Sequence, residues 1–139
     1  MTDRTSGDRA EIRELIAGYA LALDAGDIDG CVELFTADAE FLVYGRSFAG
    51  HDGIGAMFRN APHGLHLTGV SRIDLHDDTA TARSQVLFVR AGDLHLRPAL
   101  YDDELARDAT DGGQWRFRRR RCQFVTSRGL SDSPEDPPS

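Results

Sequence analysis

Two residues of this sequence combine suitable chemistry with an informative position, Asp24 and His66. Asp24 lies near the end of an apolar segment and just before a glycine. If that segment is a helix, an acid there is slightly unfavourable, because the carbonyl end of a helix carries partial negative charge. His66 interrupts a second apolar stretch, and an imidazole can act as base or acid near neutral pH. The plain alternatives are a solvated helix-end acid and a hydrogen-bonded core histidine.

The residues around His66 alternate in character. His66, Thr68 and Val70 share one parity, and the leucines at 65 and 67 take the other. Because successive side chains of a strand point to opposite faces, one face carries an imidazole and a hydroxyl. This pattern favours a strand that forms the wall of a pocket. A carboxylate beside the ring would orient it and stabilise its charged form.

Three tyrosines and one more histidine are candidates for substrate binding. Tyr19, Tyr44 and Tyr101 are the only tyrosines, and a phenol in a pocket can hold a carbonyl or a water molecule. Each of them would otherwise be a core or rim residue. His95 shares its parity with Tyr101 on a predicted strand, so we expect it to reach the pocket. The other histidines fall in turn or loop contexts and are interpreted as surface residues: His51, His63 and His76.

Helices are predicted in the first part of the chain, where they must position Asp24. Apolar residues recur at steps of three and four between about Arg9 and Ala25, which indicates an amphipathic helix. Gly26 is a good terminator, and Asp27 can cap a second short helix. The remaining elements expected here are helix 28–35, a strand at about 40–44 and a third helix at 54–60.

Strands are predicted from residue 65 onward, at about 65–75, 79–90, 94–107 and 114–126. Short polar turns join them, which indicates antiparallel pairing. Helices followed by a run of strands predict an α+β fold. We expect one domain over residues 9–126, between a flexible N-terminus at 1–8 and a disordered tail at 127–139.

Composition excludes several classes of function. The formal net charge is −7, so we expect no nucleic-acid partner, and the arginines at 116 and 118–121 would divide between two faces of a strand. There is no lysine, which excludes Schiff-base chemistry. Two cysteines without ligand spacing predict no metal site and reduced thiols in the cytoplasm. No apolar run approaches the roughly 20 residues of a membrane span.

Several segments together resemble a known family. These are residues 19–39, the Gly50-His-Asp-Gly-Ile54 entry to the third helix, Leu65-His66-Leu67, Thr79-Ala-Thr-Ala82, Tyr101 to Arg107 and Gln114-Trp-Arg-Phe117. Their order and spacing resemble the SnoaL-like and scytalone-dehydratase-like branch of the nuclear transport factor two-like superfamily. The resemblance implies a cone-shaped curved sheet packed on three N-terminal helices, with an internal apolar pocket, and a homodimer.

The resemblance also implies roles for individual residues. Asp24 and His66 match the aspartate and histidine of the catalytic pair in scytalone dehydratase and a related dehydrochlorinase, and Tyr44 matches a pocket tyrosine that holds water near the substrate carbonyl. There are departures. Scytalone dehydratase uses a second histidine on a later strand, and this chain offers only His95 near that position, out of register. The tyrosine that stands beside the aspartate in that enzyme is replaced by Leu23. The dehydrochlorinase uses a lysine in its first helix, and this chain has no lysine. The aspartate that acts as the base in ketosteroid isomerase would fall at Val43, which argues against that isomerase mechanism.

These observations predict a cofactor-independent acid–base enzyme of the dehydratase, isomerase or cyclase type. Asp24 and His66 would be catalytic, and Tyr19, Tyr44, Tyr101 and His95 would bind the substrate. That substrate is expected to be a small, apolar, cyclic, oxygenated metabolite such as a polyketide or terpenoid intermediate. Two alternatives stay open: a non-catalytic ligand-binding or assembly module, and the small subunit of a ring-hydroxylating oxygenase.

Overall fold

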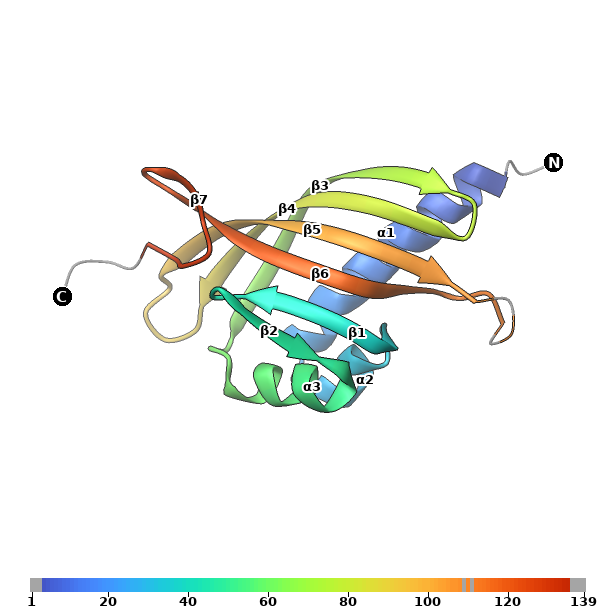
Figure 1. Cartoon of the computed structure of the whole chain (residues 1–139). Helices are drawn as coiled ribbons and strands as arrows, with labels where there is room; N and C mark the ends of the chain where they lie inside the picture. Colours follow the sequence, from blue (N-terminus) through green and yellow to red (C-terminus); the bar gives the residue numbers. More distant parts are fainter. Residues whose placement is uncertain (1–3, 109, 111, 136–139) are drawn as a thin grey trace.

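A computed structural model describes residues 4–108, 110 and 112–135. Three helices, α1 (Arg4–Asp24), α2 (Ile28–Val32) and α3 (Gly50–Asn60), pack on the concave side of one curved sheet (Figure 1). The strands are β1 (Phe35–Val43), β2 (Arg46–Ala49), β3 (Gly64–His76), β4 (Thr79–Arg90), β5 (Leu96–Arg107), β6 (Trp115–Thr126) and β7 (Gly129–Ser131). The predicted α+β class, with a curved mixed sheet on three helices, is confirmed.

The sheet has the order β2-β1-β6-β5-β4-β3, and β7 pairs with β6. The pairing of β1 with β6 is parallel, and the other pairings are antiparallel. The long strands β3 to β6 curve around α1, so the core lies between this helix and the concave face (Figure 1). The apolar stripe of α1 is buried there: Ile12, Leu15, Ile16, Tyr19 and Ala20.

The chain leaves α1 through a tight turn that the sequence predicts. Gly26 has a φ of +78°, a conformation that glycine adopts without strain. The N–H of Asp27 donates to the carbonyl of Ala22 at 2.8 Å, which closes the helix end. The Asp27 side chain then accepts from the N–H of Gly30 and caps α2. This turn fixes the direction in which Asp24 faces.

Several boundaries differ from those predicted. The first helix begins at Arg4, because polar side chains of its early turns bind the sheet: Glu11 accepts from the N–H of Trp115 at 2.9 Å, and Asp8 pairs with Arg107. Such contacts leave no apolar pattern. Strand β1 begins at Phe35, where helix was expected, because it pairs there with Phe117 of β6.

Two further expectations concern α3 and the ends of the chain. Helix α3 begins at Gly50, earlier than predicted. Residues 129–131, expected in the disordered tail, form β7 on the edge of β6. The predicted flexible N-terminus and the predicted disordered tail include residues 1–3 and 136–139, which lie outside the described residues.

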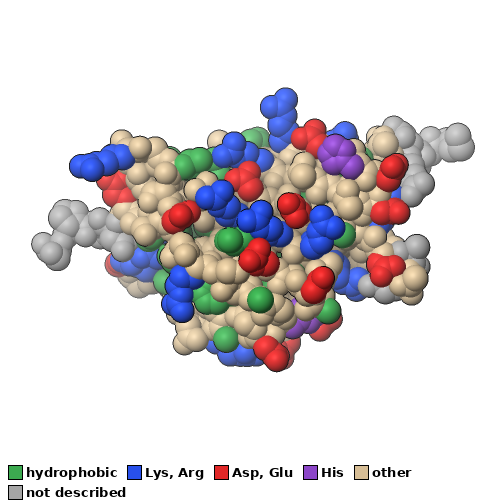
Figure 2. Space-filling view, viewed as in Figure 1, with side chains coloured by type: hydrophobic (Ala, Val, Ile, Leu, Met, Phe, Trp, Pro, Cys, Tyr) green, Lys and Arg blue, Asp and Glu red, His purple; other side chains and the backbone are tan. Residues whose placement is uncertain are grey.

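The arginines of β6 are divided unequally between the two faces of the strand, because the strand contains a bulge. Glu104 pairs with Arg119 and Leu105 pairs with Phe117, so Arg118 is an extra residue on β6. The bulge reverses the parity of the strand, and Arg120 points into the core. On the outer face, basic and acidic side chains are interspersed (Figure 2), with ion pairs Arg119–Glu40 and Arg83–Asp102.

Candidate active site

The structure brings Asp24 and His66 together at the junction of α1 and β3. Oδ1 of Asp24 lies 2.7 Å from Nδ1 of His66, and Oδ2 accepts the backbone N–H of His66 at 2.9 Å. The Asp24 carboxylate therefore contacts both the ring and the main chain of His66. Both side chains are about 15% exposed, so they lie at the edge of the core and not in solvent.

These contacts define the protonation of the imidazole. An ionised carboxylate only accepts hydrogen bonds, so Nδ1 carries the proton and Nε2 keeps a free electron pair. Burial lowers the pKa of His66 below its ordinary value, and the neighbouring Asp24 acts in the opposite direction. The ring is thus neutral at neutral pH, with a basic nitrogen opposite the Asp24 contact.

His66 lines a cavity of about 120 Å³ inside the cone. Its walls are mostly apolar and aromatic, from the ends of α1 and α3 and from β1 and β3 to β6: Leu23, Phe41, Val43, Met57, Phe58, Val86, Phe88, Ala99, Cys122 and Phe124. An apolar cavity of about 150 Å³ takes up benzene. The size therefore suits a single ring, with substituents that extend toward the open side.

The three tyrosines predicted to bind substrate all line this cavity. Tyr19 and Tyr101 are buried and meet edge to face, with ring centroids 5.8 Å apart. Burial raises the pKa of both phenols above the ordinary value, so both remain protonated donors at neutral pH. Tyr44 is more exposed and stacks on Phe124 at 5.5 Å, with a φ of +58°.

The expectation for His95 is wrong. It lies in the connection between β4 and β5, before the strand begins at Leu96, and it is not among the residues that line the cavity. Its main chain is held in that turn, where its N–H donates to Asp93 and its carbonyl accepts from Arg90. The turn ends the regular alternation on which the prediction relied. By contrast His63, interpreted as a surface residue, lines the cavity rim.

Two of the lining residues that were not predicted, Phe88 and Arg97, lie in register with His66 on β4 and β5. Phe88 lies beside His66 on the neighbouring strand, with ring centroids 4.8 Å apart. Arg97 is 8% exposed and is the partner of Phe88 on the next strand. A signal for Arg97 was present, because it shares strand parity with Tyr101, which also lines the cavity.

A second acid–base pair lies deeper in the core. Arg120 Nε is 3.0 Å from Asp103 Oδ1, and both side chains are fully buried. The guanidinium also lies over the rings of Tyr101 and Tyr19, at 3.6 and 4.2 Å from their centroids. Burial raises the pKa of Asp103 to about 6, while the charge of Arg120 opposes that rise. Neither member of this pair lines the cavity.

Within the described ranges, no three His, Cys, Asp or Glu side chains gather closely enough to hold a metal ion. None of the described helices is long and apolar enough to cross a membrane.

Comparison with solved structures identifies relatives of this arrangement. A protein with an NTF2-like and cystatin-like fold from Novosphingobium aromaticivorans is 28% identical, with a TM-score of 0.79 over 89% of this chain and 86% of that one. A Mycobacterium tuberculosis protein of unknown function is 26% identical, with a TM-score of 0.76 over 84% and 76%. A hexachlorocyclohexane dehydrochlorinase from Novosphingobium barchaimii shares the fold at 20% identity, with a TM-score of 0.75 over 96% and 97%.

Comparison at the level of sequence gives two results. A search of curated proteins returned no significant match. The family model of the SnoaL-like domain matches residues 4–121, which is most of the chain and includes both Asp24 and His66. Together with the cone-shaped sheet, this match shows that the chain belongs to the SnoaL-like family of the NTF2-like superfamily.

Proposed function

We propose that this protein is a cofactor-independent acid–base enzyme in which Asp24 and His66 form the catalytic pair. The observation that carries the proposal is the 2.7 Å contact between Asp24 Oδ1 and His66 Nδ1 at the wall of an apolar cavity. A non-catalytic module would have no need for a neutral imidazole with a basic nitrogen beside such a cavity. The reaction class is elimination, isomerisation or ring closure.

In the proposed reaction, Nε2 of His66 takes a proton from a carbon next to a carbonyl group. The electron pair of the broken C–H bond moves toward the carbonyl oxygen, and Asp24 stabilises the imidazolium that forms. In an elimination, the electrons then form a C=C bond and expel a hydroxyl group, which leaves as water after taking the proton back from His66. In an isomerisation, the same proton returns to a different carbon.

The tyrosines supply donors for the oxygen on which negative charge develops. Tyr19 and Tyr101 remain protonated because burial raises the pKa of each phenol. Tyr44 lies on the more open side, where it can hold a water molecule or a substrate oxygen. Donors that are already placed in an apolar cavity need little reorganisation as charge appears, which makes them effective.

The cavity walls indicate a small, cyclic, oxygenated substrate. The apolar lining removes water from around the imidazole and favours a hydrocarbon ring. A polyketide or terpenoid intermediate of one ring would meet both requirements. Both described cysteines are free and buried, which agrees with an enzyme of the reducing cytoplasm.

We also propose that the active form is a homodimer. The outer face of β3 carries the half-exposed side chains of Leu65 and Leu67, and Leu96 lies in the same row on β5. Exposed apolar side chains that lie together on a sheet mark a surface for association. A second copy of the chain would cover them and leave the cavity accessible from the other side of the sheet.

The proposal is tested by proton exchange, which does not require the natural substrate. A set of small cyclic β-hydroxy ketones is incubated with the protein in D₂O, and NMR follows both exchange at the carbon next to the carbonyl and loss of water. We expect the native protein to accelerate exchange, and His66→Gln to lose about 10² to 10⁴ of that rate.

A matched control lies on the same strand. His76 is exposed at the far end of β3, so His76→Gln should retain the native rate. Equal exchange by the native protein and by His66→Gln, with both proteins folded by circular dichroism, would exclude His66 as the base.

A further inference from the structure

The imidazole of His66 contacts two side chains that act on it in different ways. Asp24 Oδ1 lies 2.7 Å from its Nδ1, a contact that restrains one nitrogen. The ring of Phe88 lies beside the imidazole, with ring centroids 4.8 Å apart and an interplanar angle of 45°. Packing against the plane of the imidazole restricts the rotation that the carboxylate contact leaves open. The two contacts together set the direction in which Nε2 points.

The register of the sheet places Phe88 at this position. His66 of β3 and Phe88 of β4 are paired directly, and Gly64 pairs with Arg90. Phe88 is therefore diagonal to Gly64 on the same face of the sheet, a separation that an aromatic side chain can bridge. Gly64, His66 and Phe88 all line the cavity.

The absence of a side chain at Gly64 makes room for the Phe88 ring. A β-carbon at residue 64 would lie 2.7 Å from both Cε2 and Cζ of Phe88, and 2.2 Å from the carbonyl oxygen of Val89. Carbon atoms in good contact are about 3.5–4.0 Å apart, so only glycine lets the ring lie against the main chain here. The start of β3 thus provides a flat surface on which the ring rests beside His66.

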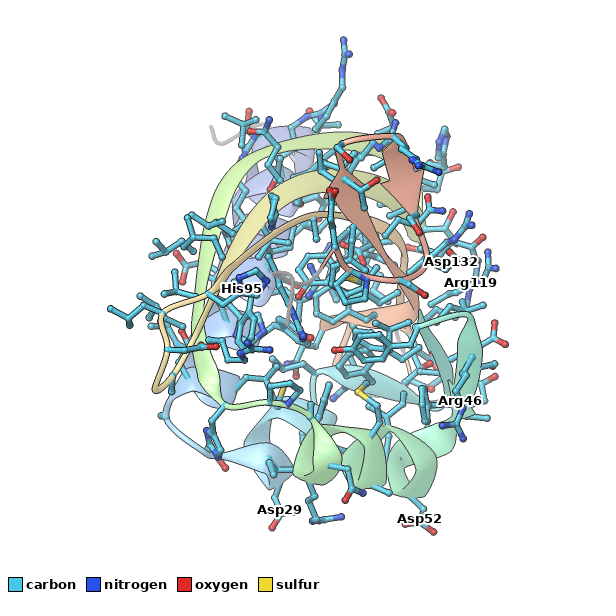
Figure 3. All side chains as sticks on the ribbon, turned by 90° about the vertical axis from the view of Figure 1, so that its left-hand side faces the viewer. Asp29, Arg46, Asp52, His95, Arg119 and Asp132 are labelled. Carbon is cyan, nitrogen blue, oxygen red and sulfur yellow. The ribbon has the colours of Figure 1, made fainter. Side chains whose placement is uncertain are left out.

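The position of Phe88 also bears on the hydration of the imidazole. The His66 side chain is 16% exposed, and burial is the main cause that lowers its pKa. Phe88 is partly exposed, and β4 ends at the open end of the cone, next to the turn that carries His95 (Figure 3). A smaller side chain at residue 88 would therefore admit water beside the imidazole.

We propose that Phe88 is a positioning residue for the base: packed on Gly64, it holds Nε2 of His66 toward the cavity and keeps water from the ring. Side chains locked by packing are the usual means of holding a reactive group in its productive geometry. This inference rests on the proposed function for the chemistry. The state of the imidazole, however, can be measured without a substrate.

The test is a ¹⁵N NMR titration of His66 in Phe88→Leu, which keeps an apolar side chain and removes the aromatic plane. We expect the titration to move to higher pH, toward the ordinary value of about 6.5, because water would relieve the burial that lowers the pKa. Water would also weaken the opposite effect of Asp24, but burial is the larger of the two. The proton-exchange rate should fall by up to about 10²-fold, the cost of displacing a reacting group by about 1 Å.

The variant changes none of the charged or titratable groups around the imidazole. Asp24 and Tyr19 face it from α1, and Arg120 acts on it from β6. The acidic side chains of Asp29 and Asp52 point away from the interior of the cone (Figure 3). The other described groups of this kind that line the cavity are Tyr44, Arg59, His63, Arg97, Tyr101 and Cys122. A shift in the titration would therefore report the hydration of the ring.

Phe124→Leu is the matched control for the titration. It makes the same change in the wall of the same cavity, where the Phe124 ring stacks on Tyr44, and it should leave the His66 titration in place. If Phe88→Leu does not fold, Phe88→Met fills more of the space without a rigid plane. It should shift the titration in the same direction by a smaller amount.

Two results would overturn the inference. One is the same His66 titration in the native protein and in a folded Phe88 variant. The other is an equal shift in Phe124→Leu, which would mean that any opening of the cavity hydrates the imidazole. If the native protein does not catalyse proton exchange while Phe88→Leu still shifts the titration, the proposed chemistry fails and the positioning of His66 by Phe88 stands.

Discussion

Two acid–base pairs lie within the same cone, and they differ in almost every physical respect. Asp24 and His66 meet at the cavity wall with each side chain about 15% exposed, whereas Asp103 and Arg120 are fully buried. Histidine can lose or gain a proton near neutral pH, but a guanidinium keeps its charge. The cavity touches His66 and does not touch Arg120.

The difference separates a pair that can carry out chemistry from a pair that holds the core in place. Arg120 lies over the Tyr19 and Tyr101 rings, so it fixes the two phenols from behind. A buried ion pair contributes little net stability, yet removal of one partner leaves an uncompensated charge in the core. The Asp24–His66 pair instead keeps a basic nitrogen accessible. We therefore expect the Asp103–Arg120 pair to govern stability and the Asp24–His66 pair to govern activity.

The largest effect is expected for Asp103→Asn. This change leaves the Arg120 charge buried without its counterion and should lower the free energy of unfolding by about 3–5 kcal/mol. Urea unfolding followed by circular dichroism measures it. Glu40→Gln, which removes one partner of an exposed pair with Arg119, is the matched control and should cost no more than about 1 kcal/mol.

A double variant sharpens this prediction. Asp103→Leu with Arg120→Met removes both charges and fills similar volume, and such replacements are often neutral or stabilising. We expect it to recover most of the stability lost in Asp103→Asn. A double variant as unstable as the single one would mean that the arginine acts through its contacts with the rings and not through its charge.

A change at the Asp24–His66 pair should act on turnover. Asp24→Asn keeps the size of the side chain but no longer selects the Nδ1–H form of His66, so we expect the proton-exchange rate to fall by about 10² to 10⁴. Its effect on the unfolding free energy should be smaller than that of Asp103→Asn, since Asp24 is partly exposed. A variant that loses stability and keeps its rate would reverse the assignment of the two pairs.

Much of this arrangement follows from sequence patterns. The apolar stripe of α1 and the alternation along β3 place Asp24 at a helix end and His66 on a strand, and the bounds of β4 are the predicted ones. These patterns are local, so they do not specify that two residues 42 positions apart are in contact. That contact depends on how the end of α1 meets β3, and it was expected from the family resemblance.

Other features have no local signal. Arg120 lies in a run of four arginines, and it points inward only because the bulge at Arg118 reverses the parity of β6. Strand β1 pairs in parallel with β6, which is far away in sequence, so its first residues, Phe35 to Ala39, were not predicted as strand. Pairing between distant segments decides both cases, and single-sequence periodicity cannot detect it.

A ¹⁵N NMR titration of the His66 imidazole tests the proposed Asp24–His66 pair most directly. Because burial lowers its pKa, we predict a neutral ring with the proton on Nδ1 at pH 7, and protonation only below the ordinary value of about 6.5. Asp24 raises that pKa, so Asp24→Asn should shift the titration to still lower pH. A His66 that is charged at pH 7, or that carries its proton on Nε2, would contradict the account.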